Sequence, residues 1–447
     1  MIETEKFPPQ VKEAFDVLNS RGYELYAVGG CVRDALMGTV PHDFDITTNA
    51  LPDEILSVFS SYHTLTHGVK HGTVTVMIKK MPIEITTYRV DGEYMDNRHP
   101  AAVEFTPNLA DDLSRRDFTV NALACNAGGE VTDLFGGIED IKRGVIRAVG
   151  DPVKRFEEDA LRILRALRFA SKLGFEIEPE TAEAARKCRH LLDNISGERI
   201  RSELEGIVCG ENVGKVLLGH SDIICAVIPE MKPCIGFLQN NPNHIYDVYT
   251  HIAVATDKCV NLPILRMAAL FHDIGKPHCY KEDKFGIGHF KGHGAASERL
   301  CREITRRLRF DRKTRETLLL LVREHDNYVK PERMAVKRRL IELGEENFRL
   351  LLELQRADNK AKAPKAYADD GAYLDKVSAF IDDFVQRRVP LKVTDLALGG
   401  SDMIKLGFVE REIGAALAKL FDAVTDEKIP NEKYALMKYA KALKNER

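Results

Sequence analysis

The chain has little that would mark a secreted, membrane-bound or disulfide-rich protein. Its nine cysteines are scattered and no two are spaced as C-x-x-C, so neither a zinc knuckle nor a disulfide framework is indicated. No apolar run reaches the roughly 20 residues of a membrane-spanning helix, and the opening residues MIETEKFPPQ lack the basic-then-apolar pattern of a secretory signal. We therefore expect a protein of the reducing cytoplasm without a membrane partner.

The chain also has little net charge, at -3 for 447 residues. This argues against a protein that coats nucleic acid through bulk charge, although it leaves room for a local basic face. The length exceeds that of one ordinary domain, and 44% hydrophobic with 30% charged residues is typical of a globular protein. We expect several domains with ample core.

The most informative stretch is YAVGGCVRDALMGTVPHDFDIT, residues 26–47. It continues an apolar run, Leu25–Val28, that is typical of a buried strand, and helical spacing follows the glycine pair. Gly29 and Gly30 would let backbone N–H groups approach a phosphate at the start of that helix. Arg33 could pair with phosphate oxygens as a fork.

Three carboxylates are candidate catalytic residues. Residues i and i+2 of a strand share a face, so Asp43 and Asp45 should project to the same side, opposite Phe44. Such a pair suits Mg²⁺, which takes oxygen ligands and leaves positions open for phosphate. Glu84 lies within a predicted strand over 82–90. It is either an exposed edge residue or a third metal carboxylate, because two-metal phosphoryl transfer commonly needs one more anionic ligand.

Together these features resemble the nucleotidyltransferase signature of the DNA polymerase beta superfamily. The form GGCVRD followed by DFD is similar to the branch that contains bacterial tRNA CCA-adding enzymes and bacterial poly(A) polymerases, in the class II form with an HD domain. The resemblance implies an α+β chain: a polymerase beta-like head with a mixed sheet and helices, followed by all-α neck, HD and tail domains. The expected bounds are 1–152, 153–238, 239–362 and 363–447.

A second motif, SRRDFTVNALACN, covers residues 114–126. Its polar residues have helical spacing around Phe118, so a capped amphipathic helix is the simplest interpretation. It also matches the family's RRDFTxNA motif, in which the arginine binds nucleotide phosphate and the aspartate and asparagine contact the ribose. The resemblance assigns these roles to Arg116, Asp117 and Asn121.

The polar segment from Asp91 to Pro107 precedes this motif and predicts a mobile loop. In the family a flexible element lies here, and enzymes that add only CC lack it. Its presence favours the ability to add adenosine.

The stretch RFEEDALRILRALRFASKLGF, residues 155–175, predicts one long helix. Its charged side is either a solvated face supported by i,i+4 Glu–Arg pairs or the family's EDxxR base-selecting motif. In the second case Asp159 accepts from the amino group of cytosine or adenine and Arg162 donates to the ring nitrogen. Uracil and guanine would set acceptor against acceptor and donor against donor. Glu158 would brace the pair, while Arg165 and Arg168 would bind or orient phosphate.

A second constellation lies further along the chain and resembles the HD phosphohydrolase superfamily. Its candidate metal ligands, in family order, are His251, His272, Asp273, His293, His325 and Asp358. Imidazole and carboxylate ligands suit a divalent transition metal, and Asp273 could bridge two ions. Lys276 could contact phosphate.

Basic residues are frequent over 299–315 and again at Arg333, Lys337, Arg338 and Arg339. They form either solvated helix faces or a tRNA contact surface. The helical tail resembles the part of family members that holds the tRNA elbow.

These motifs predict template-independent addition of CTP, CTP and then ATP to the 3′ end of tRNA by two-metal nucleotidyl transfer. The expected partners are the acceptor stem and elbow of tRNA, CTP and ATP, with a homo-oligomer left open. Two alternatives remain: an A-adding enzyme or poly(A) polymerase of the same family, and a metal phosphohydrolase whose main activity is at the HD site.

Overall fold

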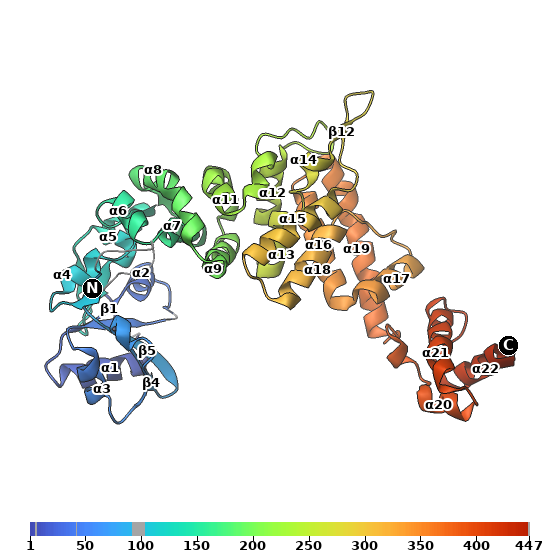
Figure 1. Ribbon diagram of the computed structural model, residues 1–447, viewed down its shortest axis with the longest axis horizontal. Coiled ribbons are helices and arrows are strands. Elements are labelled where there is room, and N and C mark those ends of the chain that lie inside the picture. The colour runs from blue at the N-terminus through green and yellow to red at the C-terminus, as the bar shows by residue number, and fades with distance from the viewer. Residues whose placement is uncertain (5–6, 42, 92–102, 446–447) are drawn as a thin grey trace. The chain divides into compact units, whose positions relative to one another are not determined.

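The computed structural model describes residues 1–4, 7–41, 43–91 and 103–445. The chain divides into two compact units (Figure 1), Met1–Pro229 with Arg307–Arg309 and Glu230–Arg306 with Phe310–Arg447. Among the described residues, no helix is long and apolar enough to span a membrane. The predicted fold class, an α+β head followed by helical domains, is confirmed.

The first unit is built on a seven-stranded mixed sheet. Within the described residues, β2 and β5 are the only neighbouring strands of this sheet that run parallel, and the other neighbours are antiparallel. In spatial order the strands are β3 (His63–Leu65), β4 (Thr73–Ile78), β5 (Met81–Thr87), β2 (Asp45–Thr48), β1 (Leu25–Val28), β8 (Leu123–Cys125) and β9 (Val131–Asp133).

The core of this sheet follows from residue alternation. Val74, Val76 and Ile78 of β4 are fully buried while the residues between them are partly exposed. Helices α1 (Pro9–Asn19) and α3 (Pro52–Val58), drawn in blue in Figure 1, contribute residues such as Phe15 and Ile55 to the same core. The helix predicted after the glycine pair is α2 (Gly30–Leu36).

Helices follow the sheet in the rest of the first unit. They are α4 (Leu109–Ser114), α5 (Gly137–Arg143), α6 (Pro152–Glu158), α7 (Leu161–Leu173), α8 (Pro179–Cys188), α9 (Gly197–Val208), α10 (Val213–Gly219) and α11 (Ser221–Val227). Strand β10 (Val145–Ile146) pairs in parallel with β11 (Glu176–Ile177). Backbone pairing therefore links the end of the predicted head to the predicted neck.

The helix predicted around the RRDFT motif is wrong. Phe118 is extended, Thr119–Asn121 is a single 3₁₀ turn, and β8 begins at Leu123. The Thr119 N–H donates to the carbonyl of Arg147, and Phe118 forms a β-bridge with Ala148. Pairing with a distant segment thus satisfies backbone groups that a helix would have satisfied locally.

The single long helix predicted over 155–175 is also wrong, because it breaks between α6 and α7. Asp159 is extended, with φ -137° and ψ 102°. Its carboxylate accepts a hydrogen bond from the Leu161 N–H at 3.1 Å. An aspartate that bonds its own backbone two residues on competes with the helix and starts a new one.

The mobile loop predicted over 91–107 is partly corrected. Its ends form a two-stranded antiparallel pair, β6 (Arg89–Asp91) with β7 (Val103–Phe105). The stretch 92–102 lies outside the described residues.

The second unit is almost entirely helical (Figure 1). Its bundle contains α12 (Val248–Lys258), α13 (Pro263–Phe271), α14 (Lys276–Cys279), α15 (His293–Arg307, ending in the first unit), α16 (Arg312–Glu324), α17 (Arg333–Leu343), α18 (Glu345–Lys360) and α19 (Pro364–Gln386). A short hairpin pairs β12 (Lys281–Glu282) with β13 (Gly288–His289). The tail helices α20 (Gly400–Lys405), α21 (Glu410–Thr425) and α22 (Lys433–Asn445) share a separate core.

The basic residues of α17 mostly have partners within the chain. Lys337 is 2% exposed and donates to the carbonyls of Val424 and Thr425 at the end of α21, so placing it on a tRNA-binding surface is wrong. Its ammonium group offsets the partial negative charge at the C-terminus of α21. Arg333 pairs with Asp383 at 2.5 Å.

Candidate nucleotide and metal sites

The three candidate carboxylates lie on, or two residues before, the neighbouring interior strands β2 and β5 of the sheet in the first unit. Asp45 opens β2 and is directly opposite Glu84 of β5 in the parallel register. Asp43 precedes Asp45 by two residues, and both are exposed while Phe44 and Ile46 are buried in the core. The structure therefore brings together the residues that the sequence could only suggest.

The charges of these carboxylates act on one another. Partial desolvation by neighbouring groups raises the pKa of Asp45, Arg116 opposes the rise and the charge of Asp43 adds to it. Partial desolvation also raises the pKa of Glu84, and the charges of Asp45 and Asp43 raise it further. Repulsion between neighbouring carboxylates is an effect that a hard divalent cation such as Mg²⁺ offsets.

The turn at Gly29 lies beside Arg116, whose charge also acts on Asp45. Gly29 has φ +75°, and a Cβ atom at this position would lie 3.1 Å from Nη1 of Arg116. Arg116 also pairs with Asp112 at 3.2 Å, as does Arg115 at 2.7 Å. Asp112 is fully buried, and although burial works to raise its pKa, the two arginines hold the pKa below the ordinary value.

Sequence reasoning missed Asp112 as a positioning residue. It stands on α4 just before the motif, and its Oδ2 accepts from the Thr47 hydroxyl of β2 at 3.3 Å. Its position four residues before Arg116, the i,i+4 relation of ion pairs on a helix, was the available signal.

The predicted ribose-contacting residues form a buried hydrogen-bond network. Asp117 accepts from the Phe118 N–H at 2.8 Å and from Asn121 Nδ2 at 3.1 Å. Arg165 of α7 pairs with Asp117 at 2.6 Å, and Arg33 of α2 donates to Asn121 Oδ1 at 2.6 Å. Burial works to raise the pKa of Asp117, but Arg165, Asn121 and Arg162 together outweigh it and the pKa falls to about 2.

The candidate base-selecting residues flank the break between α6 and α7. Arg162 donates to Glu158 at 2.8 Å and to the Arg115 carbonyl at 2.9 Å. Asp159 pairs with Arg199 of α9 at 3.1 Å. Arg199 was not among the predicted site residues. Each of these two candidate side chains therefore has a charged partner that holds it in place.

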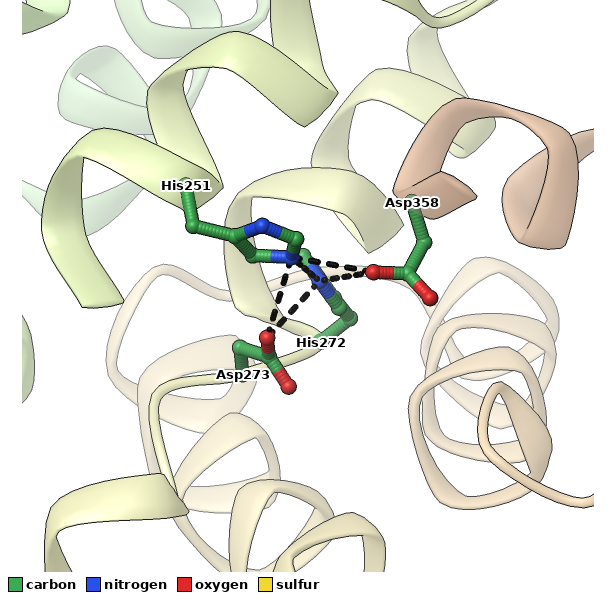
Figure 2. Close-up of side chains that lie close together, drawn as sticks. All are labelled: His251, His272, Asp273 and Asp358. Carbon is green, nitrogen blue, oxygen red and sulfur yellow. Dashed lines mark hydrogen bonds and ion pairs between the residues drawn. The ribbon is translucent and has the colours of Figure 1, made fainter. Parts of the chain in front are cut away.

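The second unit brings all six predicted HD ligands together. Figure 2 shows four of them converging from three segments: His251 from α12, His272 and Asp273 from the end of α13, and Asp358 from α18. The Nε2 atoms of His251 and His272 each lie 3.2 Å from Asp273 Oδ2. Asp358 Oδ1 lies 2.9 Å from His251 Nε2.

Asp273 is shared with a second group of ligands. The Nε2 atoms of His293 and His325 lie 3.3 and 3.4 Å from its other oxygen, Oδ1. Two sets of potential ligands thus share this carboxylate, and within each set the ligand atoms lie within 4.8 Å of one another. The sets are His251, His272, Asp273 and Asp358, and Asp273, His293 and His325. Among the described residues, neither Asp273 oxygen has a hydrogen-bond partner of good geometry although both are buried. A buried carboxylate between converging ring nitrogens, paired also with Lys276 at 2.7 Å, fits a bridge between two metal ions.

Backbone carbonyls fix the direction of these histidine rings. Nδ1 of His272 lies 2.7 Å from the Ala269 carbonyl, and Nδ1 of His293 and His325 lie 2.8 Å from the carbonyls of Phe290 and Val322. A carbonyl accepts only from a protonated nitrogen, so the Nε2 lone pairs are left to face the cluster. This is the arrangement of a metal-ligating imidazole.

A cavity of about 300 Å³ opens beside the cluster. Lys276 and Lys362 line it, at 2.7 Å from Asp273 and 2.8 Å from Asp358 respectively. His244 also lines it, and burial lowers the pKa of its imidazole to about 3. Cationic side chains beside a metal site suit an anionic substrate.

Three family models match this chain in succession. They are "Poly A polymerase head domain" over residues 25–147, "Probable RNA and SrmB- binding site of polymerase A" over residues 174–235 and "HD domain" over residues 243–362. The chain thus combines, in this order, regions similar to a poly A polymerase head, to its RNA-binding segment and to an HD domain. The resemblance predicted from the motifs is confirmed.

Relatives and solved structures narrow the comparison to CCA-adding enzymes. The CCA-adding enzyme of Lactobacillus helveticus is 48% identical over 206 residues, which cover 45% of this chain and 51% of that protein. The enzyme of Limosilactobacillus fermentum is 46% identical over 248 residues, covering 54% of this chain and 62% of that protein. The chain spans about half the length of the curated relatives it matches first.

The structural likeness extends over the whole chain. The Bacillus stearothermophilus CCA-adding enzyme in complex with CTP matches with a TM-score of 0.70, 26% identity and 99% coverage of both chains. The Thermotoga maritima CCA-adding enzyme complexed with tRNA-CCA matches with a TM-score of 0.60 and 19% identity over 98% of this chain and 97% of that one. At 19% identity, the match to the Thermotoga maritima enzyme shows a shared fold and no more.

Proposed function

We propose that this chain adds C, C and A, taken from CTP and ATP, to the 3′ end of tRNA without a nucleic-acid template. The observation that carries the proposal is the register that sets Glu84 beside Asp45, with Asp43 two residues away. The likeness to a CCA-adding enzyme in complex with CTP supports the choice of substrate. Because tRNA is a cytoplasmic substrate, the proposed activity belongs in the cytoplasm.

Each residue at the site has a proposed task. Asp43, Asp45 and Glu84 would hold Mg²⁺, which when bound lowers the pKa of the attacking 3′-hydroxyl and offsets phosphate charge. Arg116 at the Gly29 turn would bind the nucleotide phosphates together with Arg33, Arg165 and Arg168. Asp117 and Asn121 would contact the ribose. Positioning then supplies much of the rate, because the reacting groups are held in line.

The choice of nucleotide is assigned to Asp159 and Arg162. A carboxylate accepts from the amino group of cytosine or adenine, and a guanidinium donates to the unprotonated ring nitrogen beside it. Uracil and guanine present a carbonyl and a ring N–H at those positions, so both contacts become repulsive. Arg199 and Glu158, which contact these two side chains, would keep them in that orientation.

Incorporation by the pure protein on three tRNAs, ending at the discriminator base, at C and at CC, tests the proposal. CTP and ATP are supplied separately and together. We expect C, C and then A to be added, followed by a stop. Use of ATP alone, and only on the CC end, would instead identify an A-adding enzyme, and an open-ended A tail would identify a poly(A) polymerase.

Two variants test the assigned roles in the same assay. Asp43→Ala should abolish incorporation while tRNA binding survives, and retained incorporation would contradict the catalytic assignment. Arg162→Ala should reduce the preference for CTP and ATP over UTP and GTP. Unchanged selectivity would remove Arg162 from base selection.

A second activity, phosphate ester hydrolysis, is proposed for the second unit, within HD bounds of 239–362. The observation that favours it is the position of Asp273 between two sets of nitrogen and carboxylate ligands. We expect a divalent transition metal there, held by His251, His272, Asp273, His293, His325 and Asp358. Phosphatase activity that survives in Asp43→Ala and disappears in His272→Ala would establish two separable sites. The remaining proposed bounds are 1–152 for the head, 153–238 for the neck and 363–447 for the tRNA-positioning tail.

A further inference from the structure

Phe169 of α7 lies among three arginines of the proposed nucleotide site. The guanidinium carbons of Arg33, Arg165 and Arg168 are 5.3, 5.4 and 5.0 Å from the centre of its ring. The ring is 8% exposed, and Phe118 packs against it edge to face at 5.8 Å. Since Arg33 comes from α2 and the other two from α7, one aromatic ring joins two elements of the site.

Three guanidinium groups around one ring repel one another unless something compensates their charge. Each has one carboxylate partner: Asp34 for Arg33 at 2.7 Å, Asp117 for Arg165 at 2.6 Å and Glu203 for Arg168 at 3.1 Å. The negative face of an aromatic ring attracts a cation without occupying its N–H groups. The ring therefore holds the arginines while leaving N–H donors for a ligand, which a further carboxylate would not do.

We infer that Phe169 is a positioning residue for the triphosphate of the incoming nucleotide, which it serves by setting the directions of these arginines. The inference rests on the proposed function. The three arginines that it contacts are distinct from the base-selecting pair, Asp159 and Arg162. Its loss should therefore weaken the binding of CTP and ATP alike, and leave the choice of base and the chemical step unchanged.

A graded fluorination series at position 169 of the full-length protein separates this role from simple packing. Each added fluorine withdraws charge from the ring face with little change in shape, so cation–π attraction falls in steps. From fluoro- to trifluorophenylalanine, we expect KM for both nucleotides to rise stepwise to about tenfold, with kcat constant. The same series at Phe15 of α1, whose ring is buried in the core of the sheet, is the matched control and should leave KM flat.

Conventional variants provide an independent measurement. Phe169→Leu, which keeps an apolar side chain but removes the π face, should raise KM for CTP and ATP by a similar factor. Phe169→Tyr, which keeps the face, should restore the wild-type value. A thermal unfolding scan of each variant identifies any loss that comes from misfolding, and the fluorinated proteins then decide the question.

Two results would overturn the inference while the proposed function stands. One is a flat KM across the fluorinated series in an enzyme that adds CCA normally, since packing alone would then explain Phe169. The other is a fall in kcat, or in the discrimination against UTP and GTP, at constant KM. If the unmodified protein incorporates neither nucleotide, the proposed function itself fails and this inference fails with it.

Discussion

Replacing Asp117 by asparagine measures what the buried network at the nucleotide site contributes to the folded state. The carboxylate is paired with Arg165 at 2.6 Å and accepts from the Phe118 N–H and from Asn121. Its pKa falls from 3.8 to about 2 because Arg165, Asn121 and Arg162 together outweigh the effect of burial. This difference corresponds to about 2 kcal/mol of stability at neutral pH, which Asp117→Asn should remove.

The stabilisation that Asp117 provides should decrease as the pH is lowered. A carboxyl group whose pKa is lower in the folded than in the unfolded state stabilises the fold fully above pH 3.8, and this contribution is lost as the pH falls through about 2. At pH 3 about half of the contribution should remain. The difference in stability between wild type and Asp117→Asn should therefore shrink steadily between pH 5 and pH 3.

Urea unfolding of the full-length protein at several pH values provides the assay. The sequence contains no tryptophan, so Phe135→Trp introduced into both proteins gives a single fluorescence probe in the first unit. Glu183→Gln in α8 is the matched control, because Glu183 is 77% exposed in its pair with Arg186 and such pairs contribute little. Equal stability of wild type and Asp117→Asn at pH 7, or a difference that does not change with pH, would refute the reasoning.

Three further perturbations follow from the sites. Arg199→Met should free Asp159 and lower the kcat/KM preference for CTP and ATP over UTP and GTP by about tenfold; an unchanged preference would show that the contact at 3.1 Å does not orient Asp159. Glu84→Gln should slow incorporation by about a hundredfold, measured in single turnover with saturating tRNA, and near-normal rates would return Glu84 to an exposed edge residue. His325→Ala should reduce the divalent metal bound by the protein from two ions to one, by elemental analysis, with CCA addition unaffected; loss of both ions would argue against separate ligand sets on either side of Asp273.

The nature of each site could be predicted from local patterns because strand alternation is a local property. Asp43 and Asp45 share a face for the same reason that Phe44 and Ile46 share the opposite one. The HD ligands could be named from their order in the chain. What each residue type can bind is a matter of chemistry that the sequence contains.

The partners of these residues depended on contacts between distant segments. Glu84 faces Asp45 because β5 pairs in parallel with β2, a register that no local pattern encodes. Helical spacing predicted a helix at the RRDFT motif, but pairing of Phe118 with Ala148 made the segment extended.

The sequence by itself determined the order of the domains and the chemical class of both sites, since residue types and short spacings are preserved in any fold the chain adopts. Only the tertiary structure decided that α6 and α7 break at Asp159, that Arg199 pairs with it, and that three arginines surround Phe169. The reason is physical. Periodicity specifies which side of an element is buried, whereas the identity of the group packed against that side is fixed only when hydrogen bonds, charges and apolar surface from the whole unit are satisfied together.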